Sequence, residues 1–497
     1  MKKIRISALI LAMLLVLSTF TACTNEPTAD GGESTTANQT VIVEAGGTTG
    51  VSVVTPQNTT KKDQGANTTK PNGTTAAGKP NATTTAAGKP DVDSDEPTQG
   101  GWNPDTPEFQ TYSVTDFKNI YFDSEIPSNL IPTSAWDAMG VDNNGIVYFG
   151  WTCTRRNDRK EDFAVFSYNP STAKVKYLGS FMTASEEAGN LKPGEQIPKG
   201  HTKFIYHDGK MYMGSQGFHD FKEGIGTLSN YRGGHIYAYD IAKGKLEDLS
   251  ASLPDGIAVK NEGILALNFM PERNLLVGLT HPHSNLVFYN IKTGKIERQV
   301  QGIPWSYGNP LSREIVISGD KIYMYRGVEE PRNSAKEFNV YVYDYAKDTL
   351  TKTDDTCYGG FWNGQVTTLD GKTTFISTCC GELYKLDHLS GRVSHVTSMV
   401  PLDSWYGNSK INTVYSLTLS SDGKKIYYLP SMYKNSGVVE YDIESDISYT
   451  IYNLPMGVYT GNGVMDKNGY LYFASFSTTT QNWVGDCKII AFKIEKK

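Results

Sequence analysis

The sequence predicts an all-β protein with a seven-bladed β-propeller, and two observations lead to this fold class. One pattern recurs seven times between Trp136 and the C-terminus: an apolar strand, a tight turn, and a second strand rich in Tyr and Val. A third strand and a more polar fourth strand follow in most copies. Short strands at regular intervals, with turn residues between them, are typical of propellers and sandwiches. A repeat of roughly 50 residues favours the propeller, with one four-stranded sheet for each copy.

The turns between first and second strands are the most regular part of the pattern. They read DNNG, HDGK, PERN, SGDK, LDGK, SDGK and DKNG, at Asp142, Asp208, Glu272, Asp320, Asp370, Asp422 and Asp466. Asp and Asn favour such turns because their side chains bond the turn backbone, and Gly because it tolerates a positive φ. Third strands often end in Tyr-Asp, at residues 239–240, 343–344 and 441–442.

The last copy of the pattern has no fourth strand of its own. The segment from Gln110 to Phe122 precedes the first copy, and its apolar residues alternate with polar ones as in a strand. We expect part of this segment to complete the last blade. Such closure removes an open strand edge, which would otherwise invite aggregation.

Residues 1–22 have the features of a secretory signal. Three cations, Lys2, Lys3 and Arg5, precede the apolar run ALILAMLLVL, which is too short for a retained membrane helix. The run is followed by FTAC, which resembles the lipobox of bacterial lipoproteins. The resemblance implies that Cys23 is acylated and anchors the chain in the cell membrane, facing the extracellular side. The alternative is ordinary cleavage near Ala22, with Cys23 incidental.

Residues 23–108 are rich in Thr, Ala, Gly, Asn and Pro and hold few large apolar side chains. A segment of this composition cannot bury enough surface to offset its chain entropy, so we expect a disordered tether. The domain organisation predicted from sequence is therefore a signal (1–22), a tether (23–108) and a propeller (109–497).

The charge pattern argues against a nucleic-acid partner, and the cysteine count argues against a disulfide framework. The formal net charge is −6, and no basic patch or Arg-rich run interleaved with aromatic residues argues for nucleic acid. Five cysteines remain besides Cys23, an odd number without the spacing of a disulfide framework. We expect buried thiols or one incidental pair, and the neighbours Cys379 and Cys380 could form a strained bridge.

The propeller fold places its residues on two unlike faces. The Asp-Gly turns between first and second strands all lie at one end, the turn face. The opposite end, which we call the loop face, gathers the starts of the first strands and the loops after the second strands. Histidine, aromatic, Asn, Glu and Arg side chains map to the loop face, so we expect the functional site there. The predicted ligand-binding residues are Trp136, Glu262, His281, His283, Trp305, Tyr307, Trp362, Asn363 and Tyr459.

Aromatic and imidazole groups suggest what the loop face binds. Aromatic rings stack on sugar rings while polar side chains bond the hydroxyls, although some of these rings are expected to be inter-blade core. Imidazoles beside Glu262 could act as general base and acid, or hold a divalent metal through His281 and His283. A hydrogen-bonded loop role is the alternative for each histidine. The sequence assigns no definite cofactor.

Two family resemblances add expectations. Residues 110–497 resemble the seven-bladed propellers of the YVTN and PQQ-like repeat type, a likeness that names no activity. The segment HTKFIYHDGKMYMGSQGFH, from His201 to His219, is similar to part of the ulvan-lyase-type polysaccharide lyases. That resemblance implies catalytic roles for His201 and His219. Tyr231-Arg232 and Arg326 are the nearest candidates for the Tyr and Arg partners, although neither sits at the family's place.

Three hypotheses follow for the function. The first is a lipid-anchored extracellular propeller that binds a ligand, with a carbohydrate favoured over a protein, on its loop face. The second is a polysaccharide lyase that acts on uronic-acid glycans through His and Tyr acid-base chemistry, with His201, His219 and Arg326 as catalytic residues. The third is an envelope scaffold for protein partners. Propellers host many functions, so the fold alone does not choose among them.

Overall fold

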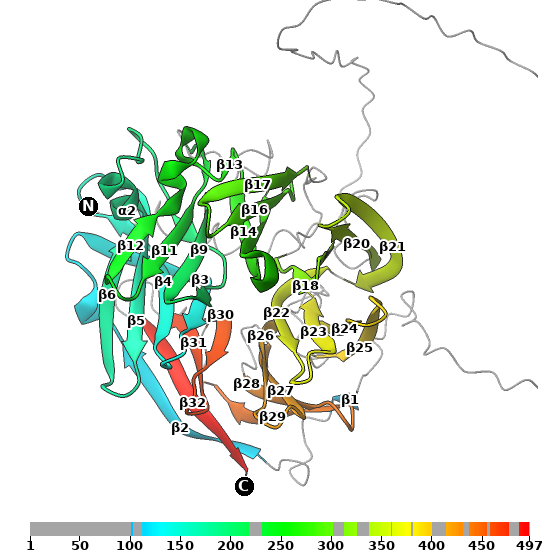
Figure 1. The fold of residues 1–497 in the computed structure, drawn as a ribbon. Helices are drawn as coiled ribbons and strands as arrows, with labels where there is room; N and C mark the ends of the chain where they lie inside the picture. Colours follow the sequence, from blue (N-terminus) through cyan, green and yellow to red (C-terminus); the bar gives the residue numbers. More distant parts are fainter. Residues whose placement is uncertain are drawn as a thin grey trace, which may run out of the picture. The chain divides into compact units, whose positions relative to one another are not determined.

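A computed structural model shows seven sheets of four or five strands arranged as a β-propeller, which confirms the predicted fold class (Figure 1). The structure describes residues 101–102, 112–217, 231–281, 283–301, 313–325, 337–358, 360–378, 381–399, 414–430, 437–454, 458–476 and 487–496. The predicted signal (1–22), nearly all of the predicted tether and the lipidation residue Cys23 lie outside these ranges.

The first four blades follow one another along the chain. Blade 1 comprises β3 (Leu130–Val141), β4 (Val147–Arg155), β5 (Glu161–Asn169) and β6 (Lys174–Ser180). Blade 2 comprises β7 (Lys199–Gly200), β8 (Ile205–His207), β9 (Lys210–Gln216), β11 (Ile236–Asp240) and β12 (Lys245–Asp248). Blade 3 comprises β14 (Gly263–Met270), β15 (Leu275–His281), β16 (Leu286–Asn290) and β17 (Lys295–Val300). Blade 4 comprises β18 (Val316–Ser318), β19 (Lys321–Tyr325), β20 (Glu337–Asp344) and β21 (Thr349–Tyr358).

The remaining three blades complete the ring. Blade 5 comprises β22 (Phe361–Thr367), β23 (Thr373–Thr378), β24 (Glu382–Asp387) and β25 (Val393–Ser398). Blade 6 comprises β26 (Val414–Leu419), β27 (Lys425–Pro430), β28 (Gly437–Asp442) and β29 (Ile447–Asn453), and β1 (Gly101–Trp102) pairs in parallel with β29. Blade 7 comprises β30 (Val458–Met465), β31 (Tyr470–Phe476), β32 (Lys488–Lys496) and β2 (Tyr112–Tyr121).

Strand β2 confirms the predicted closure of the ring. It pairs antiparallel with β32, from Tyr112 opposite Lys496 to Tyr121 opposite Lys488, and Figure 1 shows the blue β2 beside the red β32. The N-terminal strand therefore supplies the fourth strand of the C-terminal blade. Phe122 follows directly and packs against Phe149, Trp151 and Phe166 of blade 1, with ring centroids 5.0 Å from each.

The recurring turns have a local chemical cause. Asp142 Oδ1 accepts hydrogen bonds from the backbone N–H groups of Asn144 (2.8 Å) and Ile146 (2.9 Å), and Oδ2 accepts one from the Tyr148 hydroxyl (3.2 Å). Asp466 makes the same three kinds of bond in blade 7. In these two turns, one carboxylate thus closes the turn and fixes a tyrosine of the second strand.

The core lies between neighbouring blades. Apolar side chains from adjacent sheets form clusters such as the one in which Trp151 and Cys153 of blade 1 meet Tyr472 and Ile489 of blade 7. The described cysteines, Cys153, Cys357 and Cys487, are buried thiols, as expected. Cys379 and Cys380 lie outside the described residues.

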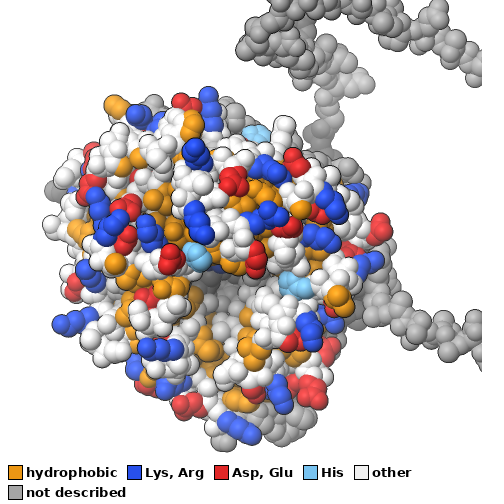
Figure 2. Space-filling view, in the orientation of Figure 1, with side chains coloured by type: hydrophobic (Ala, Val, Ile, Leu, Met, Phe, Trp, Pro, Cys, Tyr) orange, Lys and Arg blue, Asp and Glu red, His pale blue; other side chains and the backbone are white. Residues whose placement is uncertain are grey.

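The surface is mixed in charge on the face that Figure 2 shows. Basic and acidic side chains are interspersed there, and the face is hollowed near its middle. Short helices are confined to connections; the longest one described, α2 (Phe181–Glu187), follows the fourth strand of blade 1. Within the described ranges, none of the helices has the length and apolarity that a membrane span requires.

Candidate functional site

The structure brings two of the predicted residues, Trp136 and His201, together. Their ring centroids lie 5.2 Å apart, and His201 Nδ1 lies 2.9 Å from Asp137 Oδ2. Lys199 Nζ lies 3.9 Å from the centroid of the Trp136 ring, a cation–π contact. We call these four residues the Trp136 cluster. Trp136 was predicted at the start of a first strand; because β3 begins at Leu130, Trp136 lies in the middle of that strand instead.

Burial governs the electrostatics of the Trp136 cluster. Only 4% of His201 and 8% of Lys199 is exposed. Burial, helped by the nearby charge of Arg313, lowers the pKa of Lys199 to about 7. Burial also lowers the pKa of His201, against the opposing effect of Asp137. The pairing of a carboxylate with an imidazole suits a general base, but a ring this enclosed does not offer itself to a polymeric substrate.

Glu262 and His283 form a second contact that the sequence suggested. Glu262 Oε2 accepts hydrogen bonds from the Thr280 hydroxyl (2.9 Å) and the His283 backbone N–H (3.0 Å), and Oε1 contacts His283 Nδ1. His281 is buried at the end of β15, opposite Gly263. Glu262 therefore holds the loop after β15 in place. Among the described residues, no group of three or more His, Cys, Asp or Glu side chains is arranged to hold a metal ion.

The side chains of the other predicted site residues lie outside the described part of the structure. His219, Trp305, Tyr307 and Arg326 lie outside the described residues. The backbones of Trp362 and Asn363 lie in β22 and that of Tyr459 lies in β30, while their side chains are not among those described.

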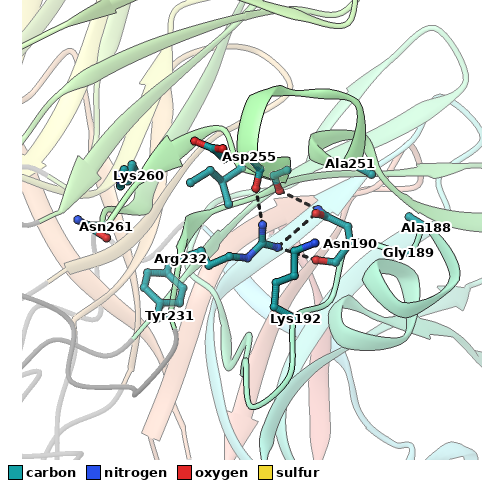
Figure 3. A pocket seen from close by; sticks show the side chains of 12 residues that line it. Ala188, Gly189, Asn190, Lys192, Tyr231, Arg232, Ala251, Asp255, Lys260 and Asn261 are labelled. Atoms are coloured by element: carbon teal, nitrogen blue, oxygen red, sulfur yellow. Dashed lines mark hydrogen bonds between the residues drawn. The ribbon is translucent and has the colours of Figure 1, made fainter. Parts of the chain in front are cut away.

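A pocket of about 700 Å³ lies at the loop face of blade 2, where sequence reasoning did not place one (Figure 3). Its walls are three connections between strands: the segment after α2, the residues before β11, and the segment between β12 and β14. Its polar lining consists mainly of Asn190, Lys192, Tyr231, Arg232, Asp255 and Lys260. We call it the Arg232 pocket. It adjoins the Glu262 contact, because the buried Tyr231 hydroxyl donates to the Glu262 backbone carbonyl (3.3 Å).

Arg232 joins the three walls of this pocket. Its Nε donates to both carboxylate oxygens of Glu195 (3.0 and 3.2 Å). Its Nη2 donates to the backbone oxygen (2.6 Å) and the side-chain oxygen (3.2 Å) of Asn190, and its Nη1 donates to the Asp255 backbone oxygen. Figure 3 shows the guanidinium between Asn190 and Asp255. The planar fork of Arg thus fixes the relative positions of loops that are distant in sequence.

A buried network supports the pocket from behind. His235, which is completely enclosed, lies 3.1 Å from Asp248 Oδ2 through Nδ1 and 3.6 Å from Glu195 Oε1 through Nε2. Asp248 also accepts hydrogen bonds from Asn190 Nδ2 (2.8 Å) and the Ser185 hydroxyl (2.7 Å).

The charges of this network are mutually dependent. Burial alone would lower the pKa of His235, but the hydrogen bond with Asp248 and the negative charge of the nearby Glu195 raise it above its ordinary value. Burial would likewise raise the pKa of Glu195 and of Asp248, but the nearby His235 imidazole and the Arg232 bond lower that of Glu195, and the hydrogen bond with His235 lowers that of Asp248. The arrangement favours an imidazolium between two carboxylates.

The sequence signal for the Arg232 pocket is the length of the connections between blades, which the strand pattern alone does not interpret. Predictions for the loop face considered strand starts and the loops after second strands. The pocket depends in addition on the connections between blades, residues 181–198 and 249–262, which are longer than a tight turn. Tyr231 and Arg232, which the resemblance suggested as the Tyr and Arg partners of a lyase site, line this pocket instead.

No protein-family model matches the chain, and no curated protein matches its sequence. A chain of the solved structure "Crystal Structure of Mitotic Checkpoint Complex" aligns with 83% of this chain and 99% of its own length, at 10% identity and a TM-score of 0.47.

Proposed function

We propose that this protein is a lipid-anchored, extracellular β-propeller that binds a carbohydrate in the Arg232 pocket on its loop face. The observation that carries the proposal is the pocket itself, about 700 Å³ in volume and open between three connected loops. Ligand sites are concave and combine a few convergent polar groups with apolar or aromatic surface. The Arg232 pocket meets this description through its amide, guanidinium and ammonium groups beside Tyr231.

The lining suits a saccharide better than an apolar ligand. Amide and charged groups can bond sugar hydroxyls, while the Tyr231 ring and Ile257 supply the apolar surface on which a sugar's CH groups pack. Hydrogen bonds fix Arg232 and Asn190 before any ligand arrives, so little conformational entropy is lost on binding. A tethered receptor for an extracellular glycan would use such a preformed site.

The lyase hypothesis remains an alternative, supported by the 2.9 Å contact between His201 and Asp137. A lyase needs His201 together with His219 and a cation at one substrate. An assay for unsaturated product with uronic-acid polysaccharides tests it, because only elimination creates the new ultraviolet absorbance. The scaffold hypothesis predicts a protein partner in place of a glycan.

A blocking substitution tests the proposal directly. Ala188 is exposed at the rim of the Arg232 pocket, so Ala188→Trp would fill the pocket with an indole. Leu369→Trp is the matched control, because Leu369 is 69% exposed on the turn face. On an array of extracellular polysaccharides, the full-length protein and the Leu369→Trp variant should bind the same glycans. Ala188→Trp should bind none of them. Equal glycan binding by both variants, or binding of no glycan by any form, would contradict the proposal.

A further inference from the structure

The Arg232 pocket is unequally charged. Its lining includes three cationic side chains, those of Lys192, Arg232 and Lys260, and one carboxylate, that of Asp255. Lys192 and Lys260 are exposed, and Figure 3 shows Lys192 extending toward Arg232 and Asn190. In the described part of the chain, the ion pairs nearby join Arg232 to Glu195 and Lys245 to Glu187, and none includes Lys192 or Lys260.

The charges behind the pocket cancel. Arg232 and a protonated His235 lie opposite two buried carboxylates, Glu195 and Asp248. The excess charge of the pocket therefore comes from its two lysines against Asp255. That excess is one positive charge, at a concave site where water is partly displaced and charge interactions are stronger than on an open surface.

Arg232 adds an oriented hydrogen-bond donor to this positive charge. Four of its five N–H groups are used by Glu195, Asn190 and Asp255, and one N–H of Nη1 has no partner among the residues that the structure describes. About a fifth of the Arg232 side chain is exposed, and it lies in the pocket lining. A fixed guanidinium N–H in a pocket that two exposed lysines also line is suited to an oxyanion, since charge-assisted hydrogen bonds are roughly twice as strong as neutral ones.

We infer that the Arg232 pocket binds an anionic group of its ligand, a carboxylate or a sulfate ester on a saccharide unit. This inference rests on the proposed function and specifies the class of carbohydrate. Arg232 Nη1 would donate to the oxyanion, and Lys192 and Lys260 would hold it by charge. The Asp255 carboxylate would face away from the anion or bond a neighbouring hydroxyl.

Matched ligands separate charge from shape. Calorimetric titration of the full-length protein with an oligogalacturonate and with its methyl ester tests the carboxylate, because the ester removes the charge with little change of shape. Chondroitin sulfate and desulfated chondroitin test the sulfate, because both keep the uronate carboxylate and only the former carries sulfate esters. We expect the more highly charged member of at least one pair to bind about tenfold more tightly than its partner, with an affinity that falls as salt is added.

Single substitutions locate the effect. Lys192→Ala and Lys260→Ala, both at exposed positions that leave the buried network intact, should each weaken binding of the acidic ligand several-fold. Lys372→Ala, at a lysine 79% exposed on the turn face, is the matched control and should leave the affinity unchanged. Inorganic sulfate should compete with the acidic ligand, and Lys192→Ala should weaken this competition.

The outcomes distinguish the inference from the proposed function. Equal affinity for the two members of each pair, or equal loss in Lys192→Ala and Lys372→Ala, would overturn the inference and leave glycan binding intact. Binding of sulfate that depends on Lys192, without binding of any oligosaccharide, would support the anion site and overturn the carbohydrate proposal.

Discussion

Gly256 is the residue where the pocket's geometry is least tolerant of change. Its φ is +69°, and a Cβ atom there would lie 1.9 Å from the side-chain oxygen of Asn190. Asn190 in turn donates to the Gly256 carbonyl (2.7 Å) and accepts from Arg232. Any side chain at position 256 must therefore displace the amide that joins two walls of the pocket.

We predict that Gly256→Ala lowers the free energy of unfolding by about 2–3 kcal/mol, from left-handed backbone strain and from the displaced Asn190. Gly189→Ala is the control, because Gly189 has a similar φ of +66° but open space around its Cβ position. It should cost only about 1 kcal/mol, for the backbone strain. Urea denaturation of both variants measures the difference, and equal losses would show that Asn190 does not require Gly256.

His235 makes stability depend on pH. Its folded-state pKa is raised by Asp248 and Glu195, whereas the unfolded value is near 6.5. A raised pKa contributes stability that is fully present below about pH 6.5 and is lost as pH rises through the folded-state pKa. The charged groups that face the ring are Glu195 and Asp248, with Arg232 bonded to Glu195.

We predict that the stability difference between the wild type and His235→Gln shrinks as pH rises above 6.5, with a slope of about 1.4 kcal/mol per pH unit until the folded-state pKa is passed. Urea denaturation of both proteins at a series of pH values measures this difference. A difference that stays constant from pH 6 to 9 would mean that His235 is neutral in the folded state.

At the scale of the elements, the ring is closed by β2, which completes blade 7. Phe122, which follows β2, is fully buried between blades 7 and 1, whereas its neighbour Tyr121 is 55% exposed. Substitutions at these two adjacent positions therefore compare the stability contributed by a ring buried between blades with that of an exposed ring at the end of β2.

We predict that Phe122→Ala destabilises the propeller by about 3–5 kcal/mol, the usual cost of deleting a buried aromatic ring. Tyr121→Ala should cost less than about 1 kcal/mol, because the ring is largely in solvent. Thermal and urea denaturation measure both. Similar losses for the two variants would indicate that the contact between blades contributes little to closure.

Elements defined by local chemistry were predictable from sequence. The bonds of the Asp142 turn join residues at most six positions apart, and the missing fourth strand of blade 7 pointed to β2. Interruptions were not predictable: the inner strand of blade 2 is divided into β7 and β8 around His201, and no local signal marks the division.

The same distinction explains the site. Trp136 and His201 meet because the first strands of blades 1 and 2 are neighbours in the ring, which the fold class implies. The Arg232 pocket depends on a bond between Arg232 and Glu195, 37 residues apart, and on another between Asn190 and the Gly256 carbonyl, 66 residues apart. Such contacts follow from the path of long connections between blades, which periodicity does not encode.

For the whole molecule, we predict a membrane anchor at Cys23, which lies outside the propeller. If Cys23 is acylated, metabolic labelling with a fatty acid should mark the full-length protein, and Cys23→Ser should abolish the label and release the protein from the membrane fraction. The variant should bind the same glycans as the wild type, because Cys23 lies outside the predicted propeller. Retention of Cys23→Ser in the membrane fraction would contradict a lipid anchor.

The central claim is that the ligand binds at the loop face of blade 2. Hydrogen–deuterium exchange of the full-length protein with and without a bound glycan tests it most directly. The account predicts slower exchange in the loops of the Arg232 pocket, residues 188–195 and 251–261, and unchanged exchange in the turns around Asp370 and Asp422. Protection confined to those turns, or to loops of other blades, would contradict it.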